Sequence, residues 1–187
     1  MADIILASQS PRRKQLLEWA ELSFDVVVQP TDESFPATLD VAEVPIHIAR
    51  NKAVAVNITA EAKMVIAADT IVVLKDEIIN KPADREDAIR MLQKLSGNTH
   101  LVITGVVIMK GEKEVAFSDI TEVVFHELSE AQIEFYVDKY KPYDKAGAYA
   151  IQEWIGVIGI KKIDGDFYNV MGLPVSRVMK AVEEFSG

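Results

Sequence analysis

The chain has 187 residues, of which 49% are hydrophobic and 26% are charged, and its formal net charge is −9 at pH 7. This composition is typical of a globular protein, and we expect one domain over residues 1–187. No segment approaches the ~20 uninterrupted apolar residues of a membrane span, and no signal-peptide pattern is present, so we expect a cytoplasmic protein with no membrane partner. The acidic balance also disfavours binding of duplex nucleic acid, although a local basic cluster can attract a small polyanion.

Missing residue types and motifs exclude several chemistries. The sequence has no cysteine, which excludes disulfides, thiolate catalysis and cysteine-based zinc sites, and its three scattered histidines disfavour a histidine-rich metal site. Any metal ion would therefore be held by carboxylates. The sequence contains neither Gly-x-x-x-x-Gly-Lys-[Ser/Thr] nor Gly-x-Gly-x-x-Gly, so the P-loop and dinucleotide-binding readings also fail.

Hydrophobic periodicity predicts strands and helices that alternate irregularly along the chain. In chain order we expect a strand at 3–7, a helix at 11–20, a strand at 24–28, a helix at 43–58, strands at 64–74 and 78–79, a helix capped by Asp84 and ending at Leu95, strands at about 99–109 and 114–125, a helix at 130–140, strands near 148–153 and 155–163, and a terminal helix from Pro174 to about Phe185. Ser129 and Gln132 form a capping box for the helix at 130–140. Because several hairpins interrupt the alternation, the pattern favours a mixed-sheet α/β domain over a doubly wound fold.

The polar turn that follows the first strand is a predicted anion site. Ser10 suits the N-cap and Pro11 the first helical position, so the unpaired N–H groups of the helix end point at the turn. Arg12 and Arg13 oppose the helix dipole, a conflict that a bound anion would resolve, with phosphate the leading candidate. A capped surface helix with solvated arginines is the alternative.

Asp69 interrupts the apolar, β-branched run from Met64 to Leu74, which predicts a strand buried on both faces. A lone carboxylate is costly to bury there unless it meets a cation, a metal ion or hydrogen-bond donors. Thr70 and neighbouring backbone groups could satisfy it, but we favour a functional carboxylate.

Other polar residues gain weight as a set. Individually, a glutamate in a polar loop and lysines on a helix or before a proline are usually solvated. Together, four cations could neutralise a triphosphate while two carboxylates hold a divalent ion, as phosphoryl chemistry requires. The cations are Arg12, Arg13, Lys52 and Lys81, and the carboxylates are Asp69 and Glu33. The amide of Gln152 could read a base edge, or could form an ordinary hydrogen bond to a neighbouring loop.

Ordered motifs run from one end of the chain to the other. They are Leu6–Arg13 with Leu16-Leu17, Asp32-Glu33, Ala49–Ala53, Ala68–Thr70, Lys81-Pro82, Thr104–Val106, Asp144–Gln152 and Asn169–Pro174. With these motifs the whole chain resembles the Maf-type nucleoside triphosphate pyrophosphatases, a family associated with inhibition of septum formation. The resemblance implies a two-lobed mixed α/β domain with an elongated mixed β-sheet flanked by helices. This fold is similar to that of inosine triphosphate pyrophosphatases, with the nucleotide in the cleft between lobes.

The resemblance also implies an activity, which is hydrolysis of a nucleoside triphosphate to the monophosphate and pyrophosphate with Mg²⁺ or Mn²⁺. It implies that Asp69 is the base that activates water or a ligand of the metal, and that Glu33 supports the metal or the water. The expected catalytic residues are Asp69, Glu33, Lys52 and Lys81, and the expected substrate-binding residues are Ser8, Arg12, Arg13, Thr70 and Gln152. Among these, Arg12, Thr70 and Gln152 match the specificity positions of the branch that prefers dTTP and UTP.

A nucleotide-binding regulator of septum formation, in which hydrolysis is secondary, is the competing interpretation. Retention of Asp69, Glu33, Lys52 and Lys81 favours an enzyme, because an inert sensor tolerates loss of the base. The sequence leaves open whether the natural substrate is a normal or a modified pyrimidine nucleotide, and whether the protein is a homodimer.

Overall fold

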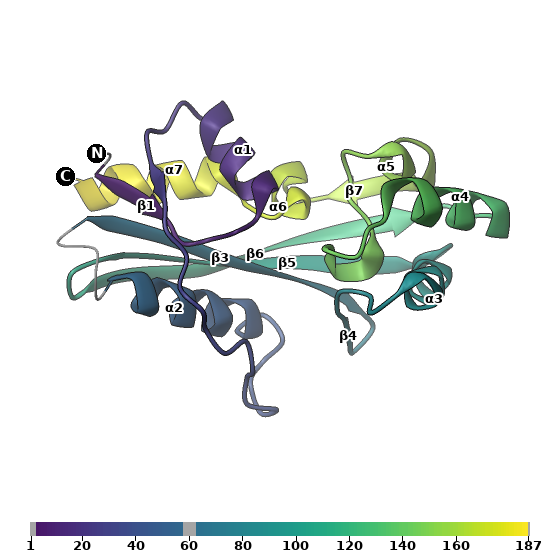
Figure 1. Ribbon diagram of the computed structural model, residues 1–187, viewed down its shortest axis with the longest axis horizontal. Coiled ribbons are helices and arrows are strands. Elements are labelled where there is room, and N and C mark those ends of the chain that lie inside the picture. Colours follow the sequence, from purple (N-terminus) through teal and green to yellow (C-terminus); the bar gives the residue numbers. More distant parts are fainter. Residues whose placement is uncertain (1–2, 58–62, 187) are drawn as a thin grey trace. The chain divides into compact units, whose positions relative to one another are not determined.

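The computed structural model describes residues 3–57 and 63–186 (Figure 1). The predicted end of the helix at 43–58 falls on residue 58, outside the described residues. The chain divides into two compact units. Unit 1 comprises Met1–Thr70, Thr104–Asp119 and Gly172–Gly187, and unit 2 comprises Ile71–Ile103 and Ile120–Met171.

The elements follow the predicted order over most of the chain. The strands are β1 (Ile4–Leu6), β2 (Asp25–Val26), β3 (Met64–Leu74), β4 (Glu77–Ile79), β5 (Thr99–Lys110), β6 (Lys113–Phe125) and β7 (Ile160–Asp164). The helices are α1 (Pro11–Trp19), α2 (Val44–Asn57), α3 (Arg85–Leu95), α4 (Glu130–Tyr140), the 3₁₀ helix η1 (Ala146–Ala148), α5 (Trp154–Gly159), α6 (Phe167–Met171) and α7 (Val175–Ser186).

The strands form one mixed sheet in the order β2-β1-β3-β5-β6-β7, with β4 paired to β3. Strand β1 runs parallel to both of its neighbours, and Leu6 pairs with Val26 on one side and Ile66 on the other. Strands β4 and β7 run antiparallel to β3 and β6. A mixed sheet flanked by helices confirms the predicted fold class.

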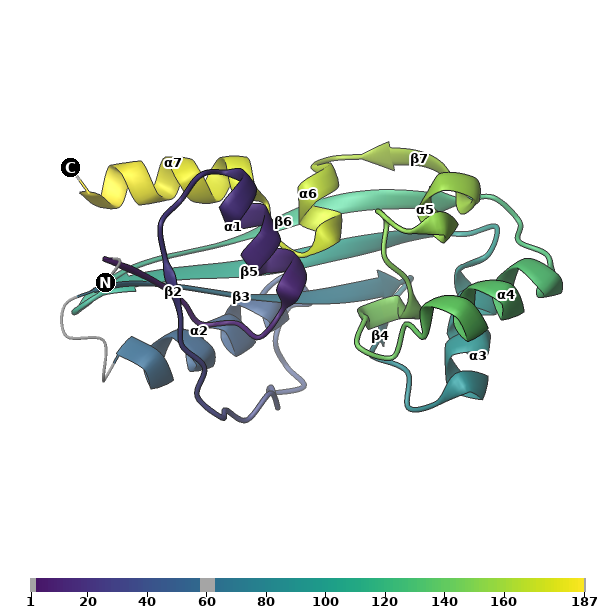
Figure 2. The same cartoon turned by 45° about the horizontal axis from the view of Figure 1, so that its top comes forward.

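Apolar packing in unit 1 fixes helix α2 against the strands. Figures 1 and 2 show α2 on one face of β1 and β3, with α1 and α7 on the other face. The core on the α2 side is built from small and β-branched residues, namely Ile5, Ala7, Ala49, Ala53, Val56, Val65, Ala67 and Val107. The start of α2 also approaches β5 closely, because a Cβ on Gly105 would lie 2.3 Å from the backbone of Pro45 and Ile46. Only glycine permits this contact.

Local capping rules explain where helix α1 begins. The Oγ of Ser10 accepts a hydrogen bond from the backbone N–H of Arg13 at 3.5 Å, and Pro11 occupies the first helical position. Both features confirm the predicted helix start. The helix buries Arg13, Leu16 and Leu17, so one of its two arginines lies inside the protein.

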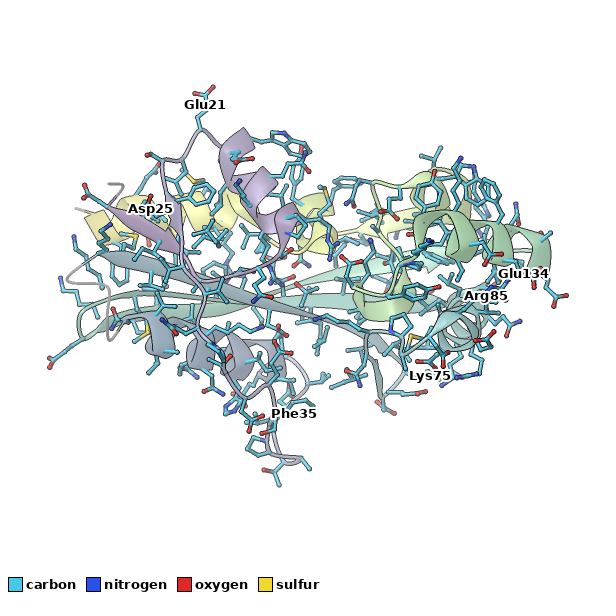
Figure 3. All side chains as sticks on the ribbon, viewed as in Figure 1. Glu21, Asp25, Phe35, Lys75, Arg85 and Glu134 are labelled. Atoms are coloured by element: carbon cyan, nitrogen blue, oxygen red, sulfur yellow. The ribbon has the colours of Figure 1, made fainter. Side chains whose placement is uncertain are left out.

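In unit 2, helix α3 packs against α4 and η1. Asp84 caps α3, and Ser129 and Gln132 form the predicted capping box at the start of α4. Arg85 of α3 reaches α4, where its Nε donates to Asp138 at 2.6 Å. A second, longer ion pair joins Arg85 to Glu134 at 3.9 Å, and Figure 3 shows these two side chains at the same end of the unit.

The predicted strand near 148–153 is wrong, and the one near 155–163 is confirmed only from Ile160 onward. Ile151 and Gln152 lie in a turn closed by a hydrogen bond from Glu153 N to Ala150 O at 3.1 Å. The apolar, β-branched run after it forms helix α5, and only its end joins strand β7. Short apolar runs fit a strand or a buried helix equally well by periodicity. The short helix α6 was not predicted.

No helix within residues 3–57 and 63–186 is both long enough and apolar enough to cross a membrane.

Candidate functional site

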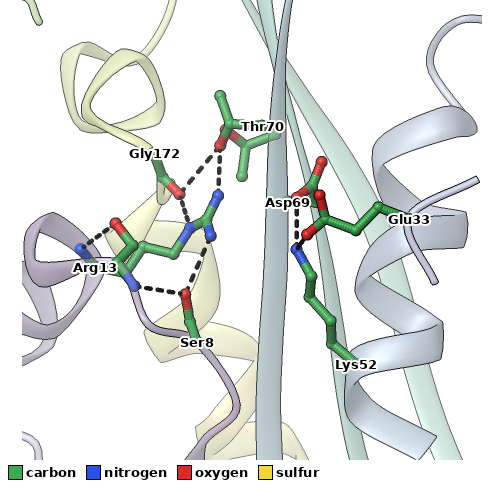
Figure 4. Close-up of polar contacts among 9 residues, drawn as sticks. Ser8, Arg13, Glu33, Lys52, Asp69, Thr70 and Gly172 are labelled. Carbon is green, nitrogen blue, oxygen red and sulfur yellow. Dashed lines mark hydrogen bonds and ion pairs between the residues drawn. The ribbon is translucent and has the colours of Figure 1, made fainter. Parts of the chain in front are cut away.

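Lys52 joins the two predicted carboxylates in unit 1. Its Nζ lies 2.8 Å from Oδ1 of Asp69 and 2.7 Å from Oε1 of Glu33 (Figure 4). The side chains of Lys52 and Asp69 are only 18% and 16% exposed, whereas that of Glu33 is 54% exposed. The ion pair of Lys52 with Asp69 is therefore better shielded from water than that of Lys52 with Glu33. Glu33 reaches Lys52 from a solvent-exposed loop.

Strand β3 places Asp69 at this point. Its residues are buried except for Asp69, Thr70 and the terminal Leu74, which are partly exposed. Successive side chains of a strand point to opposite faces. Asp69 accordingly faces Lys52 of α2, while Thr70 faces Arg13 of α1 (Figure 4).

Arg13 forms a second, buried network on the other face of β3. Its Nε donates to the carbonyl of Gly172 at 2.8 Å. One terminal nitrogen donates to Ser8 Oγ at 3.1 Å, and the other donates to Thr70 Oγ1 at 2.9 Å. The hydroxyls of Thr70 and Thr104 are also hydrogen-bonded, at 2.9 Å. Arg13 thus uses the fork geometry of its guanidinium to hold three segments of unit 1 together.

Charge links these two networks. Burial lowers the pKa of Arg13, and the neighbouring positive charge of Arg12 lowers it further. The carboxylates of Asp69 and Glu33 oppose these effects and raise it. Two arginines and two carboxylates therefore share one electrostatic environment, in which the guanidinium remains protonated.

The carboxylates of Asp69 and Glu33 also fit a divalent cation. Both approach the same ammonium group, so their oxygens converge on one position, which a cation occupies in this structure. Mg²⁺ is commonly held by one or two carboxylates, with substrate phosphates and waters as its other ligands. Among the described residues there is no cluster of three or more candidate metal ligands.

Lys81 and Gln152 belong to unit 2. Lys81 is exposed and lines a cavity of about 470 Å³ together with residues of β4 and α3, including Glu77, Met91 and Lys94. Gln152 is exposed on the turn between η1 and α5. Six of the predicted site residues form two groups of contacts in unit 1. One group is Ser8, Arg13 and Thr70, and the other is Lys52, Glu33 and Asp69. Arg12 acts on Arg13 through its charge.

Two further residues of the Arg13 network were not singled out as site residues from the sequence. Gly172 contributes a carbonyl, which no side-chain pattern reveals. Thr104 contributes a hydroxyl from within an apolar strand and is fully buried. A polar residue inside the apolar run of β5 was the available signal, because a buried hydroxyl requires a partner.

The fold is that of the Ham1 proteins. The structures from Coxiella burnetii and Staphylococcus aureus match with TM-scores of 0.52 and 0.54, cover 98% of this chain and share 15% and 16% of its residues. They are themselves covered over 100% and 99% of their length. At this identity the likeness shows the fold alone.

The family follows from the sequence itself. The profile of the Maf-like protein family matches residues 3–185, so the chain belongs to this family. A relative from Cytophaga hutchinsonii named dTTP/UTP pyrophosphatase is 54% identical and covers 97% of this chain and 84% of its own length. Relatives of the same name from Parabacteroides distasonis and Porphyromonas gingivalis are 50% and 46% identical, over 97% of this chain and 95% and 94% of their own lengths. The family resemblance predicted from the motifs is confirmed.

Proposed function

We propose that this protein hydrolyses dTTP and UTP to the monophosphate and pyrophosphate, as its relatives are named for doing. The observation that carries the proposal is the shielded contact of Asp69 with Lys52, to which Glu33 is added. In phosphoryl transfer without a covalent nucleophile, carboxylates and fixed cations position the reactants and stabilise charge.

In this proposal Asp69 accepts the proton of the attacking water or holds the metal ion, and Glu33 supports it. Lys52 keeps the two carboxylates together and presents a positive charge to the phosphates. Ser8, Arg13 and Lys81 are proposed to contribute to phosphate binding. Because three protein groups already accept from the guanidinium of Arg13, much of its effect on a phosphate would be electrostatic.

We further propose that Asp69 and Glu33 hold a divalent cation, Mg²⁺ or Mn²⁺, when substrate binds. Such an ion would neutralise charge on the triphosphate and lower the pKa of a bound water.

Pyrimidine preference is proposed to come from Arg12, Thr70 and Gln152, so normal or modified uridine and thymidine triphosphates are the substrates to test. Thr70 is well suited to a selective role because Arg13, Thr104 and the Gly172 carbonyl fix its hydroxyl. We also propose a cytoplasmic location. A homodimer is a further proposal, which light scattering of the purified protein tests. Neither a membrane nor duplex nucleic acid is proposed as a partner.

Pyrophosphate release tests the proposal directly. The purified protein is assayed with Mg²⁺ or Mn²⁺ against dTTP, UTP, CTP, GTP and 7-methyl-GTP. We expect selective release from dTTP and UTP. The variant Asp69→Asn should lose at least about a hundredfold in turnover, the usual contribution of a general base, while it still binds the triphosphate. Asp76→Asn, at an exposed turn of unit 2, is the matched control. Nucleotide binding without release from any member of the panel would instead favour the regulatory interpretation.

A further inference from the structure

The turn that carries Gln152 is closed at both ends by one buried hydroxyl group. The Oη of Tyr136 accepts a hydrogen bond from the backbone N–H of Ala150 at 3.1 Å. The same oxygen donates a hydrogen bond to Oε2 of Glu153. Tyr136 is fully buried in α4, and its bond to Ala150 is buried whereas its bond to Glu153 is partly buried. Gln152 lies between the two bridged residues and is itself exposed.

A buried lysine completes the cluster. Nζ of Lys145 lies 3.6 Å from the second carboxylate oxygen of Glu153 and 2.7 Å from Asp144 Oδ1. The Lys145 side chain is only 10% exposed and that of Glu153 only 23%. Burying an ion pair such as Lys145 and Glu153 is costly, and the pair contributes little to stability. Its effect on local geometry is therefore the better explanation for its presence.

The backbone around the turn leaves it little freedom. A Cβ on Gly156 would lie 1.7 Å from the carbonyl oxygen of Ile151, so α5 packs directly on the turn. The N–H of Gly147 donates to the carbonyl of Asn80 at 3.1 Å, which ties the segment after Lys145 to the residue before Lys81. The cluster of Tyr136, Lys145 and Glu153 therefore lies next to two segments of unit 2 that carry the predicted site residues Lys81 and Gln152.

We infer that Tyr136 and Glu153, with Lys145 as counter-charge, are positioning residues that hold the backbone of Gln152 in place and thereby set where its amide meets a pyrimidine base. Uracil and thymine present a carbonyl oxygen where cytosine presents an amino group. A primary amide can donate or accept, so the place from which a fixed backbone presents it determines which edge of the base it reaches. The inference rests on the proposed function for the role of Gln152.

The first test compares the kcat/KM ratio of UTP over CTP among variants. Tyr136→Phe keeps the ring and removes the bridge, and should lower the ratio by about threefold to tenfold, the range expected for loss of one hydrogen bond. The loss should fall mainly on the KM for UTP. Glu153→Gln, a second variant in case the first folds poorly, should act in the same direction. Tyr140→Phe is the matched control, because Tyr140 stacks on Tyr136 in the same helix.

The second test needs no nucleotide. Amide hydrogen exchange at residues 150–153 should be faster in Tyr136→Phe than in the unaltered protein, and unchanged in Tyr140→Phe. Combining Tyr136→Phe with Gln152→Ala should lower the UTP over CTP ratio no further than Gln152→Ala alone, because both act through one amide.

The outcomes separate the two proposals. Unchanged exchange in Tyr136→Phe would overturn the positioning role, as would an unchanged ratio in a protein whose ratio falls in Gln152→Ala. A ratio unaffected by Gln152→Ala would overturn the selective role of the turn. An unaltered protein with no preference for dTTP and UTP would contradict the proposed function, and the exchange measurement would then decide the positioning role alone.

Discussion

Asp69 and Thr70 are neighbours in β3, yet their side chains serve different networks on opposite faces of the strand. Asp69 bonds to Lys52 of α2 at 2.8 Å, and Thr70 accepts from Arg13 of α1 at 2.9 Å. A shift of one residue in the register of β3 would exchange these faces. The pairing of β1 with β3, in which Leu6 lies opposite Ile66, thus determines which helix each polar side chain meets.

Replacing Lys52 should impair catalysis more than folding. Lys52→Met leaves Asp69 and Glu33 as like charges without their shared cation, so we expect turnover of UTP to fall by about tenfold or more, as loss of a charged hydrogen bond gives. Pyrophosphate release measures this. Lys162→Met removes an exposed ion pair with Asp164 and should leave turnover unchanged. Equal activity of Lys52→Met and the unaltered protein would remove Lys52 from the site.

Arg13→Lys should destabilise unit 1. A lysine cannot donate at once to Ser8, Thr70 and the Gly172 carbonyl, so groups fixed by the guanidinium would lose their partners. We expect the free energy of unfolding in urea to fall by about 2–3 kcal/mol. Arg90→Lys, on the surface and 3.0 Å from Asp87, should change it by less than about 0.5 kcal/mol. Similar losses in both variants would contradict a special role for Arg13.

His100 should make the protein less stable in acid. Burial lowers its pKa to about 4, from an ordinary value of 6.5, and its Nε2 lies 2.7 Å from the hydroxyl of Tyr149. Between these two values the unfolded chain binds the proton and the folded protein does not, so stability is full above pH 6.5 and is lost as the pH falls toward 4. The loss amounts to at most about 3 kcal/mol.

Urea unfolding at several pH values between 7 and 4 measures this dependence. His100→Gln removes the titrating group, so its stability should fall less steeply with acid than that of the unaltered protein. His126→Gln replaces an exposed histidine and serves as the control. Parallel pH profiles for His100→Gln and the unaltered protein would show that another group is responsible.

Gln152→Glu should weaken selection for dTTP and UTP. The carboxylate accepts hydrogen bonds but does not donate, so it opposes a base carbonyl and tolerates an amino group. We expect the kcat/KM ratio of UTP over CTP to fall by about tenfold or more, since one mismatched polar contact leaves a group unpaired. An unaltered substrate profile would refute base reading by Gln152.

Much of the fold was accessible from the sequence because local rules and burial agree there. The apolar run around Asp69 predicted β3, and Ser10, Asp84 and Ser129 predicted three helix starts that the structure confirms. The region after Ala148 failed because its β-branched residues match a strand by local preference, whereas the chain turns so tightly there that Gly156 of α5 lies against the backbone of Ile151.

The site was only partly accessible for a different reason. Lone polar residues such as Asp69 stand out against an apolar strand, and the family motifs supply the remaining side chains. The carbonyl of Gly172 and the bridge from Tyr136 depend on contacts between distant segments, which composition and spacing do not encode. Such partners become visible only once the chain is folded.

The close approach of Gly105 to Pro45 fixes the position of the start of α2 against β5. Lys52 lies seven residues beyond Pro45, roughly 10 Å along the helix axis at the rise of an α-helix. Any side chain at position 105 would push the start of α2 away from β5 and tilt the rest of the helix. The Lys52 ammonium would then move away from the Asp69 carboxylate although neither residue had changed. The position of the Lys52 ammonium thus depends on the absence of a side chain at Gly105, on strand β5.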